Sequence, residues 1–424
     1  MQVRLEAQRG RRLDRAFAEA ARRLEARERA FAHELSHGVT RLRGRLDHLL
    51  APHVHRGLDS VEPTLLEILR LGTYQLLYMD RVPGYAAVSE TVDQVRAAVG
   101  DKPAGFANAV LRKVLSAGDD IGLFPDLGGD PVGHLAAWGS HPEWLVKRWL
   151  ERWEADDVRR LVEVNNRRPD VFVLPLELSP KEALQRLGES EIGASVVGHA
   201  TDCVRLEDAG RVGEALSVVG PAIVQDPAAN LVTRYADVPP GTIVADLCAA
   251  PGGKILAMSG GPKTLLASDR SESRIEMVKE NARRTGRRLV PVVADALHPP
   301  FRAVDAVLLD VPCSGTGTLS RHPDARWRLR PSTIGELAAL QRRMLVAGAD
   351  IVTQGGLLVY STCTLESEEN ESVVDAFLAE RTDFRLEPSG AVPSAYVDSH
   401  GRLAVTPHDH GFDGAFAARL RRVA

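Results

Sequence analysis

The feature that most constrains the fold is an alternation of apolar strands and helices that begins after residue 241. Phe384 lies near one of two expected closing strands, and the other covers 415–423. Strands joined by helices favour a mostly parallel sheet with helices on both faces. We therefore expect a Rossmann-like α/β domain with a seven-stranded sheet over residues 237–424. The other expected strands are 242–248, 263–269, 289–295, 303–312 and 356–363, and the expected helices are 273–286, 334–353 and 366–381.

The first third of the chain has a helical pattern instead. Apolar residues recur three and four positions apart between residues 13 and 117, which predicts an all-α domain over about 1–130. The expected helix breakers between the periodic segments are Pro52, Gly57, Pro63, Pro83, Gly84 and Pro103.

The middle of the chain, residues 131–236, is the least regular part. A loop rich in glycine, aspartate and proline at 118–133 leads into it, and a single helical stretch is expected over 141–166. Short β-like segments such as 171–174 follow. We expect a linker and a small mixed α/β region here, which makes three domains in 424 residues.

Composition limits the class of protein. The first residues are charged, and no stretch of about 18 apolar residues occurs, so we expect no signal peptide, no membrane span and a cytoplasmic location. Four scattered cysteines predict free thiols, and we expect no metal site. The net charge of −4 argues against a nucleic-acid partner, but residues 1–50 carry twelve arginines against seven acidic residues. Either an RNA contact or a solvated helix face accounts for that excess.

A turn rich in small residues follows the first strand of the α/β domain. Small residues at the carboxyl end of such a strand let backbone approach a ligand closely. The spacing differs from the dinucleotide fingerprint, and Lys254 is followed by Ile255 rather than by the Ser or Thr of a phosphate-binding loop. The turn, expected to bind the cofactor, consists of Cys248, Ala249, Ala250, Pro251, Gly252, Gly253 and Lys254, after Asp246.

Three aspartates follow successive strands of the same domain. Asp269 lies 23 residues after Asp246, where a carboxylate can accept hydrogen bonds from ribose hydroxyls, and Asp295 and Asp310 end the next two strands. Carboxylates repel a polyphosphate but tolerate a sulfonium cation. We infer that S-adenosylmethionine is the cofactor.

Two cysteines occupy like positions at the ends of neighbouring strands. Cys313 follows Asp310 in a Pro/Gly turn, and Cys363 ends the fifth strand. A thiolate that adds to C6 of a pyrimidine makes C5 nucleophilic enough to accept an activated methyl group, and a base must then remove the C5 proton. The sequence by itself does not rank the two thiols. Cys203 and the side chain of Cys248 are interpreted as small buried hydrophobes.

Four segments carry a family resemblance. DLCAAPGGK, LLDVPCSGTGT with RHPDARWR behind it, LAALQRRML and YSTCTLESEENE resemble, in order and spacing, the NOL/NOP/Sun family of RNA cytosine-C5 methyltransferases. The helical segments LEILRLGTYQLLYMDRVPGYAAVSETVDQVR and GFANAVLRKVL look like the NusB-like RNA-binding domain of the bacterial Sun-type members. The pair of domains implies methylation of 16S rRNA. A tRNA enzyme and a non-catalytic RNA-binding or antitermination factor are the alternatives.

The resemblance implies roles for matching residues. The turn at 248–254 would contact the cofactor, Asp269 its ribose, Asp295 its adenine, and Asp310 its methionine end or the target base. Cys363 would be the nucleophile, and Cys313 would assist proton removal or adduct release.

RNA contacts are expected beyond the cysteine turn. Arg321, His322, Trp327 and Arg328 are placed to hold phosphate and stack a base, and the region at 131–236 is expected to aid RNA recognition. The target cytosine must leave its stack, which favours a loop as substrate. We expect RNA as partner and a monomeric protein. The candidate phosphate contacts near the N-terminus are Arg4, Arg9, Arg11, Arg12, Arg22 and Arg23.

The acidic residues after Cys363 raise a question about its thiolate. Glu366, Glu368 and Glu369 are expected at the start of the helix over 366–381, where negative charge suits the helix dipole. Negative charge near the thiol would raise its pKa.

Overall fold

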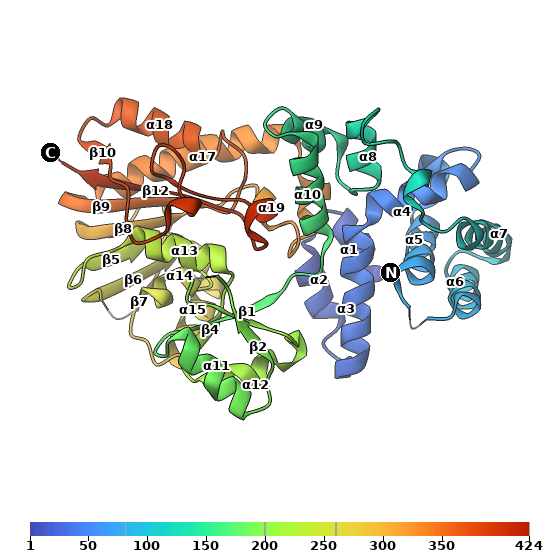
Figure 1. Cartoon of the computed structure of the whole chain (residues 1–424), viewed down its shortest axis with the longest axis horizontal. Coiled ribbons are helices and arrows are strands. Elements are labelled where there is room, and N and C mark those ends of the chain that lie inside the picture. Colours follow the sequence, from blue (N-terminus) through green and yellow to red (C-terminus); the bar gives the residue numbers. More distant parts are fainter. Residues whose placement is uncertain (81, 199–200, 259–260, 424) are drawn as a thin grey trace. The chain divides into compact units, whose positions relative to one another are not determined.

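The computed structural model describes residues 1–80, 82–198, 201–258 and 261–423, which form two compact units (Figure 1). The first unit comprises residues 1–168 together with 319–331, and the second comprises 169–318 together with 332–424. The short segment 319–331 follows the Cys313 turn in sequence but belongs to the helical unit. No helix among the described residues is long and apolar enough to cross a membrane.

The first unit is helical, as its periodicity predicted. Helix α5 starts with Pro63 in its first turn, and the Glu62 carboxylate caps it by accepting from the Leu65 N–H at 2.8 Å. Pro103, expected between helices, lies instead in the first turn of α7, where its missing N–H costs nothing. The helices are α1 (Gln2–Gln8), α2 (Leu13–Ala20), α3 (Ala26–Arg41), α4 (Arg43–Leu50), α5 (Pro63–Tyr78), α6 (Gly84–Ala98), α7 (Asp101–Ala117), α8 (Pro131–Ala137), α9 (Glu143–Leu150), α10 (Ala155–Asn166) and α16 (Ala325–Arg328).

The helical stretch expected at 141–166 is two helices, so that expectation was wrong. Helix α9 ends at Leu150, and α10 starts after Glu154, whose extended backbone cannot continue a helix. The amphipathic pattern persists across the break because Trp149, Val158 and Leu161 are all buried. A break between two amphipathic helices is therefore invisible to periodicity alone.

Buried ion pairs lie inside the helical unit. Arg4 Nε lies 2.6 Å from Glu67 Oε2, and Arg70 binds Asp47 with two bonds of 2.6 and 2.7 Å. Arg70 also pairs with Glu67. Arg4, a candidate RNA phosphate contact from sequence, is only 4% exposed and already paired, so that candidate was wrong. A side chain so buried makes intramolecular contacts instead.

Segment 319–331 is fixed in the helical unit by Arg326. This guanidinium is fully buried and donates to the carbonyl oxygens of Asn165, Leu319 and Ser140 at 3.0, 3.2 and 3.1 Å, and to Asn166 Oδ1 at 2.8 Å. Burial lowers its pKa well below the ordinary value. A buried guanidinium is tolerated when most of its donors are satisfied in this way.

The second unit contains the predicted doubly wound sheet. Its strand order is β10-β12-β9-β8-β5-β6-β7, with β11 paired to β12 beside this path. Strands β5 to β9 pair in parallel, while β12 is antiparallel to β9. The fold class is therefore confirmed, with an eighth strand in addition. The strands are β5 (Ile243–Asp246), β6 (Thr264–Asp269), β7 (Val290–Val293), β8 (Val304–Asp310), β9 (Val352–Thr362), β10 (Phe384–Leu386), β11 (Leu403–Val405) and β12 (Ala415–Arg422).

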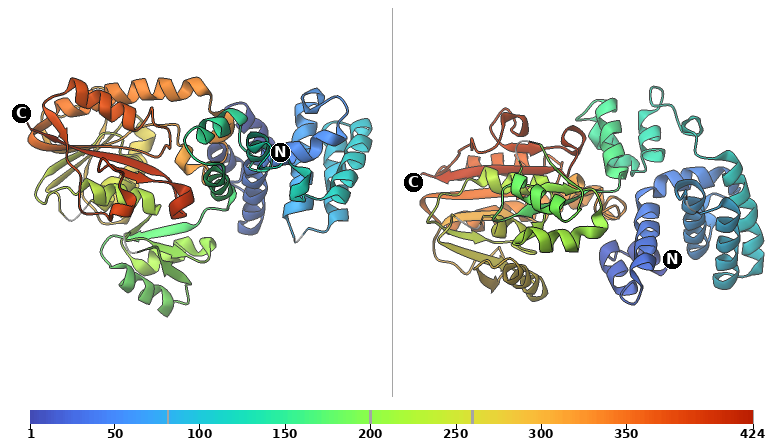
Figure 2. Two further views of the ribbon diagram at one scale, coloured as in Figure 1. Left: turned by 45° about the horizontal axis from the view of Figure 1, so that its top comes forward. Right: turned by 60° about the horizontal axis from the view of Figure 1, so that its bottom comes forward.

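Helices cover both faces of this sheet (Figures 1 and 2). Successive strand residues alternate between two cores, since Val244 and Leu308 belong to one and Ala245 and Leu309 to the other. Near-continuous apolar strands are what two covered faces require. The covering helices are α13 (Pro227–Ala236), α14 (Gly253–Ala257) and α15 (Glu272–Arg284) on one face, and α17 (Pro331–Asp350) and α18 (Glu371–Glu380) on the other.

The predicted boundaries of two helices that cover this sheet were wrong. The helix expected over 334–353 ends at Asp350, and β9 already begins at Val352. The helix expected from Glu366 begins only at Glu371. The side chains of Glu366 and Glu369 are both buried in the turn before it. Tertiary burial overrides the helix propensity of these glutamates.

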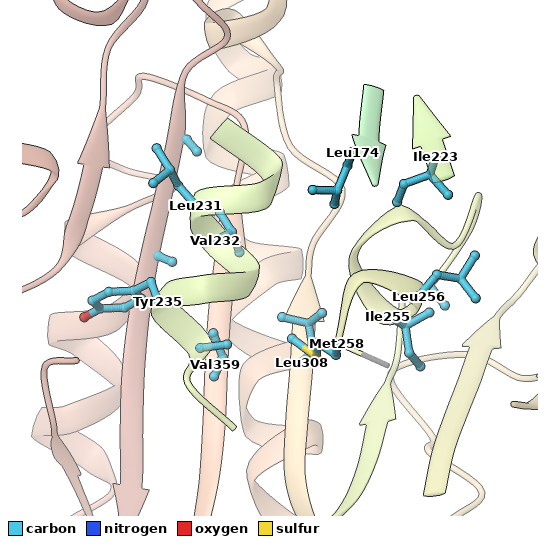
Figure 3. Packing of buried hydrophobic residues seen from close by; sticks show 14 of the residues in the cluster. Leu174, Ile223, Leu231, Val232, Tyr235, Ile255, Leu256, Met258, Leu308 and Val359 are labelled. Atoms are coloured by element: carbon cyan, nitrogen blue, oxygen red, sulfur yellow. The ribbon is translucent and has the colours of Figure 1, made fainter. Parts of the chain in front are cut away.

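A smaller antiparallel sheet with order β2-β3-β1-β4 precedes the large one. Its element order, β-α-β-β-α-β, is that of a ferredoxin-like fold. Leu174 and Ile223 from this sheet join the core formed by α13, α14 and the large sheet (Figure 3). The elements are β1 (Val171–Pro175), α11 (Pro180–Glu189), β2 (Ala194–Val196), β3 (Val204–Leu206), α12 (Val212–Val219) and β4 (Ala222–Val224).

Candidate active site

The turn after β5 has the backbone shape that its glycines predicted. Gly252 has φ +104°, and a Cβ there would lie 3.3 Å from Leu256 Cδ1. A Cβ on Gly253 would come 3.0 Å from Gln225 Nε2. The buried Oε1 of Gln225 has no hydrogen-bond partner within the described part of the chain. Glycine backbone beside an unsatisfied polar atom suits a polar ligand that approaches the main chain closely.

Asp246, at the end of β5, is buried beneath this turn. Its Oδ1 accepts from the Cys248 N–H at 3.1 Å. Burial, with the nearby Asp310 carboxylate, raises the pKa of Asp246 to about 7. Asp246 thus holds the turn in place through this hydrogen bond. Its carboxyl group changes protonation near neutral pH.

Asp269 and Asp295 follow the next two strands. Asp269 is 4% exposed, and its carboxylate accepts from the Ser271 N–H at 3.0 Å and lies 3.3 Å from Arg274 Nε. Asp295 lies two residues beyond the end of β7 and accepts from the Leu297 N–H at 2.9 Å. Parallel pairing of β5, β6 and β7 puts their carboxyl ends at one edge. The roles predicted for these two aspartates remain predictions.

Asp310, Lys254 and Ser361 form a polar cluster at the same edge. Lys254 Nζ lies 2.7 Å from Asp310 Oδ2, and Ser361 Oγ donates to Asp310 Oδ1 at 2.9 Å. Burial is the largest influence and lowers the Lys254 pKa, but the charge and hydrogen bond of Asp310, together with Cys363 and Asp246, raise it above the ordinary value. Lys254 therefore keeps its positive charge at neutral pH.

The two cysteines predicted at neighbouring strand ends lie together. Their Sγ atoms are 3.4 Å apart, and the Cys363 N–H donates to the Cys313 sulfur at 3.4 Å. Gly315 has φ +70° in the turn after β8, and its hypothetical Cβ would lie 3.9 Å from the Cys363 sulfur. Both cysteines are half-buried.

The environment distinguishes the two thiols. The pKa of Cys363 is lowered, chiefly because Cys313 donates a hydrogen bond to its thiolate, and the Lys254 cation lowers it further, whereas burial and Asp310 oppose. The pKa of Cys313 is raised well above the usual value by that same bond, by burial and by Glu369. Cys363 is therefore the member of the pair that ionises first.

Glu369 was misplaced by the sequence reasoning, which put it at a helix start beside Cys363. It lies instead under the Cys313 turn, where its carboxylate accepts from the Ser314 N–H at 2.9 Å, from Gln341 Nε2 at 2.8 Å and from Thr364 Oγ1 at 3.2 Å. Burial raises its pKa, although these bonds oppose the shift. Its charge is one of the causes that raise the pKa of Cys313.

The other two cysteines lie outside this pair. Cys203 is fully buried, and Cys248 is half-buried in the glycine turn. Burial raises the pKa of both thiols. No group of three or more His, Cys, Asp or Glu side chains suited to a metal ion occurs among residues 1–80, 82–198, 201–258 and 261–423.

The four predicted RNA contacts all lie in the helical unit rather than with the cysteines. His322 Nδ1 lies 3.1 Å from Asp14, Trp327 Nε1 donates to the Thr40 carbonyl at 2.8 Å, and Arg328 Nε donates to Asp324 at 2.9 Å. Arg321 belongs to the same segment. Their contact with RNA remains a prediction.

Three families match successive parts of the sequence. Residues 1–116 match the NusB family, residues 141–213 match an RsmF/B-like ferredoxin-like domain, and residues 236–421 match the family described as 16S rRNA methyltransferase RsmB/F.

Two bacterial proteins are similar over almost their whole length. The chain is 34% identical to the probable ribosomal RNA small subunit methyltransferase B of Synechocystis sp., over 93% of this chain and 91% of that one. It is 31% identical to the protein of the same name from Bacillus subtilis, over 94% and 92%.

A solved structure resembles the whole chain. The crystal structure of PH0851 gives a TM-score of 0.77 at 25% identity and covers 99% of this chain and 97% of that one. This structural similarity covers all three segments that match a family, residues 1–116, 141–213 and 236–421. The chain belongs to the RsmB/F family of 16S rRNA methyltransferases.

Proposed function

We propose that this rRNA methyltransferase transfers a methyl group to C5 of a cytosine in 16S rRNA, through a covalent bond between Cys363 and C6 of that cytosine. The observation that carries the proposal is the pair of sulfur atoms 3.4 Å apart with Lys254 and Asp310 beside them. Two thiols with opposite pKa shifts fit a reaction that needs one nucleophile and one proton carrier.

S-adenosylmethionine is the methyl donor of the family, and it supplies a methyl group on a sulfonium centre, ready for nucleophilic attack. The glycine turn at 248–254 offers backbone to this cofactor, and Asp269 offers a carboxylate for its ribose. Asp295 is assigned to the adenine side, and Asp310 to the methionine end or the target base. Gln225, whose Nε2 lies beside Gly253 and whose Oε1 has no hydrogen-bond partner among the described residues, is consistent with a ligand at this turn.

The chemistry begins with the Cys363 thiolate. It forms a bond to C6, and the electron pair of the C5–C6 double bond shifts to C5 in conjugation with C4, so that C5 becomes enamine-like and nucleophilic. C5 would then attack the sulfonium methyl group, and the methyl–sulfur bond would break to leave S-adenosylhomocysteine. When a base removes the C5 proton, the double bond re-forms and the Cys363–C6 bond breaks, which returns the thiolate.

Cys313 has a role that changes during the reaction. While Cys363 is a thiolate, Cys313 keeps its proton and donates a hydrogen bond to it. Once Cys363 is bonded to C6 it carries no charge, so the main cause of the raised Cys313 pKa is gone. Cys313 can then lose its proton to water and accept the C5 proton, which drives release of the adduct.

Methyl transfer from tritium-labelled S-adenosylmethionine tests the proposal. We expect label in naked 16S rRNA, and nucleoside analysis should find it in 5-methylcytidine. Label in tRNA alone would favour the tRNA alternative. RNA binding without any transfer would favour a non-catalytic factor, and label on another nucleoside would overturn the C5 assignment.

A further inference from the structure

A cavity of about 600 Å³ lies inside the helical unit, apart from the cysteine site. It is bordered by α1, α4, α5 and the segment 319–331. Its volume is in the usual range for small-ligand sites. The side chains that matter to the argument are Arg4, Arg43, Asp59, Arg70, Trp327 and Arg328.

Four arginines and three aspartates line this cavity: Arg4, Arg43, Arg70 and Arg328, and Asp47, Asp59 and Asp324. Asp324 accepts a hydrogen bond from Arg328 Nε at 2.9 Å. Arg4, Glu67, Arg70, Asp47 and Arg43 form a chain of neighbouring charges, with three cations and two anions. Asp47 already binds Arg70 with both oxygens, and the Arg43 Nε lies 3.8 Å from it, too far for a hydrogen bond. Among Arg4, Arg70 and Arg43, the Arg43 guanidinium is therefore the one whose positive charge is least neutralised by a carboxylate.

A planar stack borders the same cavity. The Arg43 guanidinium lies over the Trp327 ring, 5.2 Å from its centroid. The ring is held by the hydrogen bond from Nε1 to the Thr40 carbonyl. A Cβ on Gly44 would lie 3.3 Å from Trp327 Cη2, so the glycine permits close approach of the ring. A guanidinium can stack on one plane while its edge donates to an anion.

We propose that this cavity binds one nucleotide of single-stranded rRNA substrate, with its base against the Arg43–Trp327 stack and its phosphate on Arg43 and Arg328. Bases of single-stranded RNA stack on aromatic rings and arginine planes, and arginine recognises phosphate through paired donors. The exposed Asp59 carboxylate can accept from an exocyclic amino group of the base but repels an acidic peptide. The inference rests on the proposed function only in taking RNA as the substrate.

Anisotropy of a short fluorescein-labelled single-stranded oligoribonucleotide, titrated with the full chain at several salt concentrations and without cofactor, tests the site. Arg43→Gln should weaken binding about tenfold and reduce the slope of log K against log salt by about 0.7, as expected for one lost phosphate contact. Trp327→Leu should weaken binding about tenfold with an unchanged slope, because a stack carries no counterion. Arg328→Gln should change the slope as Arg43→Gln does.

Arg112→Gln, an exposed change in α7, is the matched control and should bind RNA as the parent chain does. A 16S transcript containing 4-thiouridine should crosslink to the peptide with Trp327, which gives a readout in the unmodified protein. Unchanged affinity in all three variants, or crosslinks only elsewhere, would overturn the site. So would displacement of the RNA by a polyglutamate peptide. If the three variants weaken RNA binding as expected but the parent chain transfers no methyl group to RNA, the proposed chemistry alone would be wrong.

Discussion

The sulfur atoms of Cys313 and Cys363 lie 3.4 Å apart, although 50 positions separate them in the chain. Strands β8 and β9 are parallel neighbours, so the residues just beyond their carboxyl ends meet at one edge of the sheet. The pair is asymmetric chiefly because Cys313 donates the hydrogen bond between the two sulfurs, which lowers the pKa of Cys363 and raises that of Cys313. Lys254 lowers the pKa of Cys363 further, and Glu369 raises that of Cys313 further. The first and third predictions below test the two sides of this asymmetry.

Lys254→Gln should raise the pKa of Cys363, because the variant removes the cation that favours its thiolate. At pH 7 we expect alkylation of Cys363 by iodoacetamide to slow about tenfold, and to recover at higher pH. Peptide mapping by mass spectrometry measures each thiol separately. Lys263→Gln, an exposed change in the same unit, should leave the profile unchanged. An identical profile in Lys254→Gln would refute the role of this cation.

Asp246→Asn should stabilise the protein at pH 8 and have little effect at pH 4. The folded pKa of about 7 lies above the ordinary value of 3.8, so the native state holds a proton that the unfolded chain loses first. Stability from this group is therefore lost as pH rises from about 4 to about 7. The expected gain in the free energy of unfolding at pH 8 is on the order of 2–4 kcal/mol.

Urea unfolding at the two pH values measures this effect. Asp375→Asn, an exposed substitution in the same unit, serves as the control and should show no such dependence. Equal stability of Asp246→Asn and the parent chain at pH 8 would contradict the raised pKa of Asp246.

Glu369→Gln should lower the pKa of Cys313 while keeping the shape of the buried side chain. The carboxylate that raises this pKa is removed, and the amide can still accept from the Ser314 N–H. Thiol titration of Cys313 in a Cys363→Ala background isolates the effect.

Glu369→Ala should also cost about 1–3 kcal/mol of stability, since buried donors lose their acceptor. Glu368→Gln is the neighbouring control, and a Cys313 pKa unmoved by Glu369→Gln would exclude the charge effect.

Gly252→Ala should weaken cofactor binding beyond its effect on stability. A left-handed backbone costs an alanine about 1–2 kcal/mol. Gly286→Ala provides strain from a positive φ of +67° with open space around the Cβ, so both variants should melt at lower temperatures, Gly252→Ala at least as low because its Cβ would also crowd Leu256. Calorimetric titration with S-adenosylhomocysteine should then show weaker binding only for Gly252→Ala. Equal binding in both variants would argue against the turn as a cofactor contact.

The sheet and the meeting of the two cysteines were predictable because local patterns determine them. Apolar strands separated by helices imply parallel pairing, and parallel pairing brings residues after β8 and β9 to one edge. The glycine turn was visible for a similar reason, as Gly252 needs a positive φ where the chain reverses after β5.

Other features depend on partners that are distant in sequence. Nothing near Arg326 indicates that its segment packs in the helical unit, where its acceptors include Asn165 and Ser140. The burial of Glu369 depends on Gln341 and on the Cys313 turn, so a helix-start assignment was the natural but wrong reading of its neighbours. Arg4 was misjudged because its partner Glu67 lies 63 residues away.

Covalent capture of RNA by single-cysteine variants tests the central claim most directly. The full chain carrying Cys313→Ala, incubated with S-adenosylmethionine and 16S rRNA, should accumulate a protein–RNA species that survives a denaturing gel, because Cys363 still adds to C6 but release is slow. Cys363→Ala should form no such species and transfer no methyl group. A covalent species with Cys363→Ala, or none with Cys313→Ala while its methyl transfer continues at the parent rate, would contradict the account.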